Sequence, residues 1–150
     1  MPDADTAGVL APPPLIYLAG LIAGFAAEAL LPSASAPWPL GVVLLVAGAA
    51  LAASFVRALH GGGTAVDPYK PTSAIVTTGP YRFTRNPGYV ALALIYAGIA
   101  LTAGALWPLA TLAIVLVVID RGVIAREERY LERRFGEEYG RYRARTRRWV

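Results

Sequence analysis

The chain has 150 residues, of which 56% are hydrophobic and 16% charged, and its formal net charge is +4. Soluble domains carry about 25% charged residues, so this balance excludes an ordinary water-soluble globule and indicates a small membrane protein. With no Cys and a single His, the chain has no disulfide, no cysteine nucleophile and no means to build a thiolate or multi-histidine metal site, so we expect no metal.

Two apolar stretches occupy the first part of the chain. Residues 14–31 contain Glu28 as their only charge, and residues 40–57 are apolar up to Arg57. Each is close to the ~20 residues that cross a bilayer core, so both are expected to span the membrane. The uncharged, Pro-rich connection 32–39 fits a turn at one membrane surface. Glu28 lies near its helix end, where it can reach the interface, although an intramembrane acid can also be functional.

A second apolar region follows a polar loop and is too long for one span. Gly and Pro interruptions near its middle predict a tight hairpin of two spans, 88–103 and 106–120, with Pro108 in the first turn of the second helix. The predicted fold is an all-α integral membrane protein, one domain over residues 1–150 with about four transmembrane helices. Both polar segments that carry the Lys and Arg residues then face one side, which the positive-inside rule makes cytoplasmic.

The loop between the second and third spans, residues 60–87, is rich in Gly and Pro and is expected to be irregular. Its polar groups concentrate at 79–89, directly before the third span. Asn86 suits a helix N-cap and Pro87 suits the first helical position, which explains the pair without any ligand. Two Arg and two Tyr at a helix N-terminus also favour a site for a carboxylate or phosphate, because the free backbone N–H groups there attract anions. Both interpretations remain open at this point.

The chain ends in an Arg-rich segment, residues 121–150, with ten Arg against five Glu. Apolar residues recur in it at helical spacing, which predicts an amphipathic cytoplasmic helix lying on the membrane surface or on the loop. Glu127 and Glu128 begin this helix and either face the cluster around Arg85 or pair with Arg one turn away. The positive-inside rule explains the charge more simply than nucleic-acid binding, so no nucleic-acid partner is expected.

These motifs resemble the family of integral-membrane methyltransferases that includes isoprenylcysteine carboxyl methyltransferase and the phospholipid methyltransferases. The resemblance covers roughly residues 67–149. It rests on Thr-Thr-Gly-Pro-Tyr at 77–81, Arg-Asn-Pro-Gly-Tyr at 85–89, Glu-Glu-Arg-Tyr-Leu at 127–131 and Phe-Gly-Glu-Glu-Tyr at 135–139. It implies that S-adenosylmethionine is the methyl donor, S-adenosylhomocysteine the product, and a lipophilic molecule the acceptor.

The resemblance also implies a donor pocket between the loop, the last two membrane helices and the C-terminal segment. Arg85 suits the donor's carboxylate, and one of Glu127 and Glu128 suits its ammonium or ribose hydroxyls. Arg85 and Glu128 are the expected catalytic residues. Asn86 stands where family members often have His, and because an amide does not titrate it is not expected to act as a base. The implied cofactor-binding residues are Thr77, Gly79, Tyr81, Arg85, Asn86, Tyr89, Glu127 and Glu128.

The predicted function is methylation of a lipophilic carboxylate, amine or thiol at the cytoplasmic face of a bacterial inner membrane, with membrane lipids as partners. The bacterial source is inferred from the abundance of Ala, Gly and Arg. One alternative is an NADPH-dependent membrane reductase, since sterol reductases have C-terminal regions resembling this one, although Lys70, Arg82 and Arg85 offer few contacts for phosphates. The other is a non-catalytic scaffold whose Arg-rich segment binds anionic lipid with ~1 kcal/mol per basic residue.

Overall fold

The computed structural model describes residues 11–64 and 72–150, and within these ranges the protein is helical and contains no strand. The all-helical class predicted from the sequence is confirmed. Besides the α-helices there is one 3₁₀ turn, η1, and one π-helical turn, η2, in the described part. In chain order the elements are α1 (Pro13–Leu30), α2 (Trp38–Gly61), η1 (Gly79–Arg82), α3 (Pro87–Thr102), α4 (Trp107–Ile119), η2 (Asp120–Ile124), α5 (Ala125–Phe135) and α6 (Glu137–Arg145).

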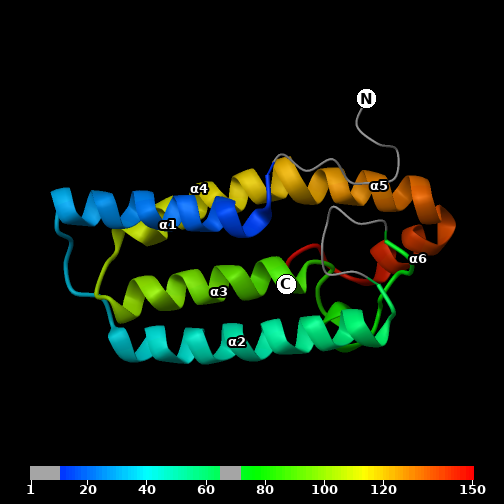
Figure 1. The fold of residues 1–150 in the computed structure, drawn as a ribbon, viewed down its shortest axis with the longest axis horizontal. Coiled ribbons are helices and arrows are strands. Elements are labelled where there is room, and N and C mark those ends of the chain that lie inside the picture. Colours follow the sequence, from blue (N-terminus) through cyan, green and yellow to red (C-terminus); the bar gives the residue numbers. More distant parts are fainter. Residues whose placement is uncertain (1–10, 65–71) are drawn as a thin grey trace.

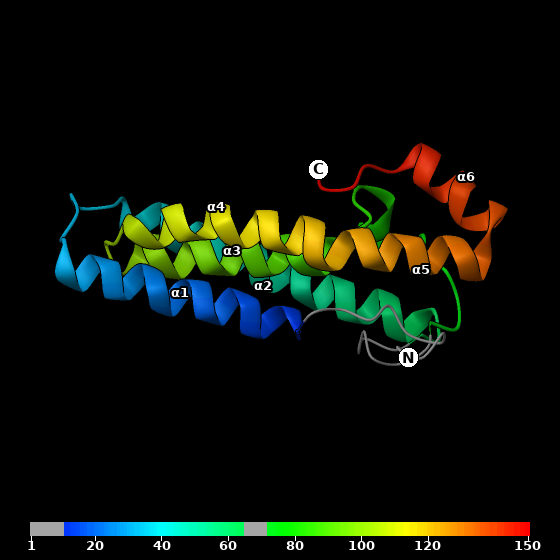
Figure 2. The same cartoon turned by 90° about the horizontal axis from the view of Figure 1, so that it is seen from above.

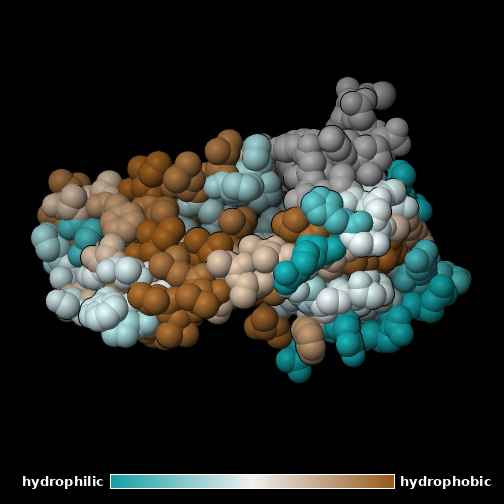
Figure 3. Space-filling view, turned by 60° about the horizontal axis from the view of Figure 1, so that its bottom comes forward, coloured by the Kyte–Doolittle hydropathy of each residue, from teal (hydrophilic) through white to brown (hydrophobic). Residues whose placement is uncertain are grey.

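Three helices in the described ranges are long and apolar enough to cross a membrane. They are α1, α2 and the continuous helix Trp107–Phe135, which joins α4, η2 and α5. Helix α3 is also apolar but has only 16 residues. Apolar residues cover the middle of the bundle, and hydrophilic residues gather at the end that carries α5 and α6 (Figure 3). This distribution is the one expected of a bundle that lies in a bilayer with one charged end in water.

The largest difference from the predicted elements lies after the fourth span. The helix does not stop near residue 120 but runs through η2 into α5 (Figure 2). The wholly apolar part is α4, and charged residues begin at Asp120. The segment then breaks at Gly136, whose φ of 51° favours glycine. The single amphipathic helix expected from the apolar spacing is therefore wrong in its extent: α6 is a separate helix that folds back toward the bundle (Figure 2).

The bundle is built from two helix pairs, α1 with α4 and α2 with α3, with α3 also contacting α1 and α4 (Figure 1). Glycines bring the paired backbones close together. A Cβ at Gly24 would lie 2.4 Å from the Cα of Pro108, and a Cβ at Gly48 would lie 3.1 Å from the carbonyl oxygen of Ala91. Close approach matters in lipid, where van der Waals packing is the main attraction between helices.

The end of the bundle away from α5 and α6 is closed by Glu28. Its carboxylate accepts hydrogen bonds from the backbone N–H of Ser33 at 2.6 Å, from the Ser33 hydroxyl at 2.7 Å, and from the N–H groups of Leu106 and Trp107 at 3.0 and 3.1 Å. The last two are free N–H groups at the start of α4, which carries the positive end of the helix dipole. Glu28 thus does not simply reach toward the interface; it joins α1, the following turn and α4.

A cluster of buried apolar residues forms where α1, α3, α4 and η2 meet. Trp149, from the end of the chain, packs against this cluster. The last residues are therefore held against the bundle close to the beginning of α3. The cluster consists of Tyr17, Tyr96, Val115, Ile119, Val123 and Ile124.

Candidate functional site

The loop after α2 is held by tyrosines of the C-terminal segment. Gly79 has a φ of 59° and starts η1, which packs on α2. The Tyr142 hydroxyl donates to the carbonyl oxygen of Tyr81 at 2.8 Å, and the N–H of Thr72 donates to the Tyr130 hydroxyl at 3.2 Å. Because the described part of the loop has no regular structure beyond η1, these contacts hold it against the C-terminal segment.

A cavity of about 410 Å³ lies between α2, α3, the loop and the two C-terminal helices. One part of its wall is polar and the other is apolar, so it can hold a molecule that carries both characters. The principal polar lining residues are Tyr81, Arg85, Asn86, Tyr89, Glu127 and Tyr139. The apolar wall from α2 and α3 includes Phe55, Val56, Leu59, Ala91, Leu92 and Ile95.

The structure brings five of the eight expected cofactor-binding residues together around this cavity. They come from the loop, the first turn of α3 and α5, which are far apart in the sequence. Thr77 and Gly79 lie at the exposed surface of the loop and do not line the cavity, and Glu128 is buried without lining it. The five lining residues are Tyr81, Arg85, Asn86, Tyr89 and Glu127.

Arg85 is a buried cation with one unused donor. Its Nη2 donates to Glu128 Oε1 at 2.7 Å, and its Nη1 donates to the carbonyl oxygens of Thr146 at 2.5 Å and Arg143 at 3.2 Å. The side chain is 10% exposed, yet its Nε–H is buried and has no hydrogen-bond partner among the described residues. Buried donors are paired in the great majority of cases, so an unpaired one on a residue that lines a cavity points to a ligand acceptor.

Glu127 is the acid that faces the cavity. The Tyr89 hydroxyl donates to its Oε1 at 2.7 Å. Burial raises the pKa of Glu127 to about 7; the Tyr89 hydrogen bond opposes this rise and the neighbouring charge of Glu128 adds to it. At neutral pH this carboxyl can therefore exist in either protonation state.

Glu128 is the next residue, yet its surroundings have the opposite effect on the pKa of its carboxyl. It accepts from Arg85 on one oxygen and from Arg148 Nη2 at 2.5 Å on the other. Burial favours protonation, but the hydrogen bonds and charges of Arg148 and Arg85 outweigh it and lower the pKa of Glu128 below its usual value. Glu128 is therefore ionised at neutral pH and pairs with two guanidinium groups.

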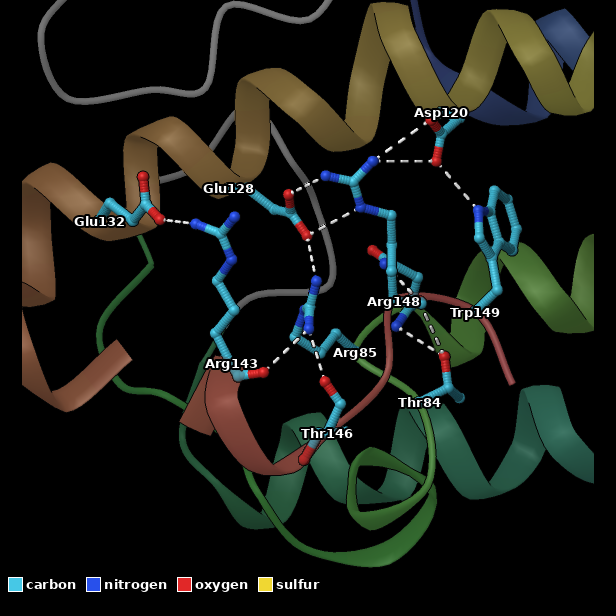
Figure 4. Close-up of polar contacts among 10 residues, drawn as sticks. Thr84, Arg85, Asp120, Glu128, Glu132, Arg143, Thr146, Arg148 and Trp149 are labelled. Carbon is cyan, nitrogen blue, oxygen red and sulfur yellow. Dashed lines mark hydrogen bonds and ion pairs between the residues drawn. The ribbon is translucent and has the colours of Figure 1, made fainter. Parts of the chain in front are cut away.

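The last residues of the chain form what we call the C-terminal clamp, Thr146–Trp149 (Figure 4). The guanidinium of Arg148 reaches both Glu128 and the two carboxylate oxygens of Asp120, the latter at 3.3 Å each. The indole N–H of Trp149 donates to Asp120 Oδ1 at 2.9 Å. The clamp thus connects α5 with the end of α4.

The clamp also holds the residues just before α3. The N–H of Arg85 donates to the carbonyl oxygen of Arg147 at 2.9 Å. Asn86 is the N-cap residue of α3 by position, as expected, but its side chain makes no capping bond. Instead its Nδ2 donates to the carbonyl oxygen of Arg148 at 2.8 Å, which also accepts from the Thr84 hydroxyl at 3.2 Å.

Asp120, Arg148 and Trp149 were not among the residues singled out from the sequence. Asp120 offered a weak signal, since it is the acid that ends a long apolar run. Arg148 offered none, because nothing distinguishes it from the other Arg residues of the segment. Their roles depend on a contact between positions 28 residues apart or more, which no local pattern encodes.

Comparison with known proteins identifies the family. The family model for phospholipid methyltransferase matches residues 38–138, about two thirds of the chain, and the chain belongs to this family. Together with the apolar helices, this makes it an integral membrane protein of a methyltransferase family. The match runs from α2 into α6 and includes the five lining residues discussed above, whereas the C-terminal clamp lies beyond it.

A relative of this chain is an uncharacterized protein of Haemophilus influenzae, 54% identical over 37 residues. The matched stretch is 25% of this chain and 59% of that protein. No solved structure matches the chain.

Proposed function

We propose that the protein transfers a methyl group from S-adenosylmethionine to a lipophilic acceptor at the cytoplasmic face of a bacterial inner membrane. In this proposal α3 is the fourth membrane-crossing helix beside α1, α2 and α4. The loop, α5 and α6 lie on the cytoplasmic side, where the Arg-rich segment meets anionic lipid. Membership of the phospholipid methyltransferase family supports the reaction class.

The observation that carries the donor assignment is the buried, unpartnered Nε–H of Arg85, a residue that lines the cavity. S-adenosylmethionine has a carboxylate, an ammonium, a ribose diol and a sulfonium. Arg85 Nε suits the carboxylate, and Glu127 suits the ammonium or the ribose hydroxyls. The rings of Tyr81 and Tyr139, both on the cavity wall, suit the sulfonium by cation–π attraction. The residues present therefore fit this donor.

When bound, the donor supplies an activated methyl group, so the chain needs no covalent nucleophile. Its residues align the donor with the acceptor and exclude water, a contribution of up to ~7–11 kcal/mol in favourable cases. The buried position of Arg85 and Glu128 serves this purpose, because rigid paired side chains do not have to reorganise during the reaction. Glu128 contributes by holding Arg85 rather than by lining the cavity.

The apolar wall of the cavity supports a lipophilic acceptor. Phe55 of α2 and Leu92 of α3 line the side that continues into the membrane helices. Glu127 lies at the polar end of the same cavity and can take a proton from an amine or thiol acceptor, whereas a carboxylate acceptor needs no base. All three acceptor groups remain compatible with this arrangement.

The two alternatives receive less support from the site. A nicotinamide dinucleotide phosphate needs several cations, but Arg85 is the one basic residue that lines the cavity in the described ranges. Arg82 is exposed, and Lys70 lies outside the described residues. A scaffold would have no need of a cavity with an unpaired buried donor.

Calorimetric titration of the purified protein with S-adenosylhomocysteine tests the proposal. We expect saturable binding in the micromolar to millimolar range and no thermal stabilisation by NADPH. Absence of binding at millimolar ligand rejects the donor assignment. Stabilisation by NADPH instead of S-adenosylhomocysteine supports the reductase.

A further inference from the structure

The C-terminal clamp has no part in the function proposed so far. It does not line the cavity, and it lies outside the residues that the family model matches. Yet Thr146–Trp149 contacts Arg85 and Asn86, which line the cavity, as well as Glu128 and Asp120 (Figure 4). The clamp is thus the layer of structure directly behind the donor site.

The charges in this layer are balanced. Arg85 and Arg148 face Glu128 and Asp120, so two cations meet two carboxylates. Glu128 lies between the two guanidinium groups: its Oε1 accepts from both, and its Oε2 accepts from Arg148. If Arg148 were absent, Glu128 would have a free oxygen and an uncompensated charge next to Arg85, the group that the donor's carboxylate must approach.

The contacts that Arg148 makes with two carboxylates require a guanidinium group. Its Nη2 and Nε reach Glu128 at 2.5 and 3.2 Å, while its Nη1 reaches Asp120 at 3.3 Å. A lysine ammonium keeps the charge but is a compact point that lacks the planar fork, so it cannot bridge the two carboxylates at positions 120 and 128 of the same continuous helix in the same way. The main-chain carbonyl of Arg148 meanwhile fixes Asn86.

We propose that Arg148 is a positioning residue of the donor site. It acts through Glu128 and Asn86, and it keeps the Arg85 guanidinium in the position in which it can bind the donor's carboxylate. The inference rests on the proposed function, because it assumes that the cavity holds a nucleoside with a charged amino acid group. It adds a specific consequence: Arg148 affects recognition of the amino acid end of the ligand and leaves recognition of the nucleoside end intact.

Two ligands separate these ends. S-adenosylhomocysteine carries the amino acid group, and 5′-methylthioadenosine has the same nucleoside and thioether without it. The variants are Arg148→Gln, which removes the charge, and Arg148→Lys, which keeps it. Arg145→Gln is the matched control, since Arg145 is an exposed Arg of the same segment. Affinities are measured by calorimetry, and circular dichroism and thermal unfolding report on the fold.

We expect Arg148→Gln to weaken S-adenosylhomocysteine binding about tenfold. This is a small loss of affinity for removing one member of a charge pair, because the Arg148 side chain is 35% exposed. Binding of 5′-methylthioadenosine should stay within about twofold of wild type, as should both ligands with Arg145→Gln. Arg148→Lys should recover part of the lost affinity, because it restores the charge without the fork.

The outcomes separate the two proposals. If the wild type binds neither ligand, the donor assignment fails and the positioning role fails with it. If the wild type binds S-adenosylhomocysteine and Arg148→Gln binds it equally well, the donor site stands and the positioning role is overturned. Equal loss of both ligands also overturns it, since Arg148 would then only maintain the fold. Should Arg148→Gln not fold, Arg148→Lys decides: a smaller loss confined to S-adenosylhomocysteine supports the role, and any other pattern rejects it.

Discussion

The two ends of the bundle use acidic side chains in different ways. At the end without α5 and α6, Glu28 accepts four hydrogen bonds and closes the start of α4. At the other end, Glu128 is equally well paired, but its partner Arg85 keeps an unused donor and the adjacent Glu127 faces a cavity. Complete pairing is typical of a structural role, whereas incomplete pairing beside a cavity is typical of a ligand site.

The contrast is sharpest between Glu127 and Glu128, which are neighbours in the sequence. Successive residues of a helix point about 100° apart, so the two carboxyls enter different surroundings. Glu128 meets two cations and its pKa falls, while Glu127 meets a tyrosine and apolar walls and its pKa rises. The following predictions test this division of roles, from the largest expected effect to the smallest.

Replacing Arg85 should affect ligand binding most. Arg85→Ala removes the free Nε–H and leaves Glu128 without one of its two cations. We expect the affinity for S-adenosylhomocysteine to fall by at least about thirtyfold, as when one member of a buried charge pair is deleted. Calorimetry measures the change, with Arg82→Ala, an exposed loop Arg, as the control. Unchanged affinity in Arg85→Ala would remove the basis for the donor site.

Replacing Glu128 should affect stability most. Glu128→Gln leaves Arg85 and Arg148 facing a neutral amide, so we expect the free energy of unfolding to fall by about 3 kcal/mol. Titration with a denaturing detergent, followed by circular dichroism, measures this. Glu137→Gln is the control, because Glu137 forms an exposed ion pair with Arg141 that is worth about 0.5 kcal/mol or less. Similar losses in both variants would show that the buried ion pairs are unimportant.

Glu127 should control how stability depends on pH. Its pKa rises from 4.5 to about 7 on folding, so the folded state binds more protons between these values and stability falls as pH increases through that interval. The melting temperature of the wild type should therefore drop between about pH 5 and about pH 8. Glu127→Gln should lose most of this dependence. An identical pH profile in the variant would mean that the carboxyl does not titrate there.

Replacing Glu28 should have the smallest effect and should leave ligand binding unchanged. Glu28→Ala removes the acceptor for the free N–H groups at the start of α4, and we expect a small loss in the free energy of unfolding. S-adenosylhomocysteine affinity should match the wild type. Ser35→Ala in the same exposed turn is the control. Weaker ligand binding in Glu28→Ala would mean that the two ends of the bundle are coupled.

Most of the fold could be predicted from local pattern. Apolar runs of near-bilayer length predicted α1 and α3 to within one residue of their observed ends, and Asn86–Pro87 predicted where α3 begins. The continuation of α4 through η2 into α5 was missed, because the polar residues that begin at Asp120 read as the end of a span. Nothing in their composition distinguishes a helix that stops from one that leaves the membrane and continues into water.

The amino-acid sequence alone determined the membrane class, the helical content and the family motifs, because each depends on hydrophobicity, charge and spacing over short stretches of chain. Only the tertiary structure decided that Glu127 lines the cavity while Glu128 does not, and that Arg85 keeps an unpaired Nε–H. It also decided that Arg148 pairs with Glu128 outside the lining of the cavity. These features arise from contacts between residues up to 64 positions apart, and such contacts exist only after the helices have packed. Hydrogen-bond pairing and burial are properties of that packing, so no local pattern contains them.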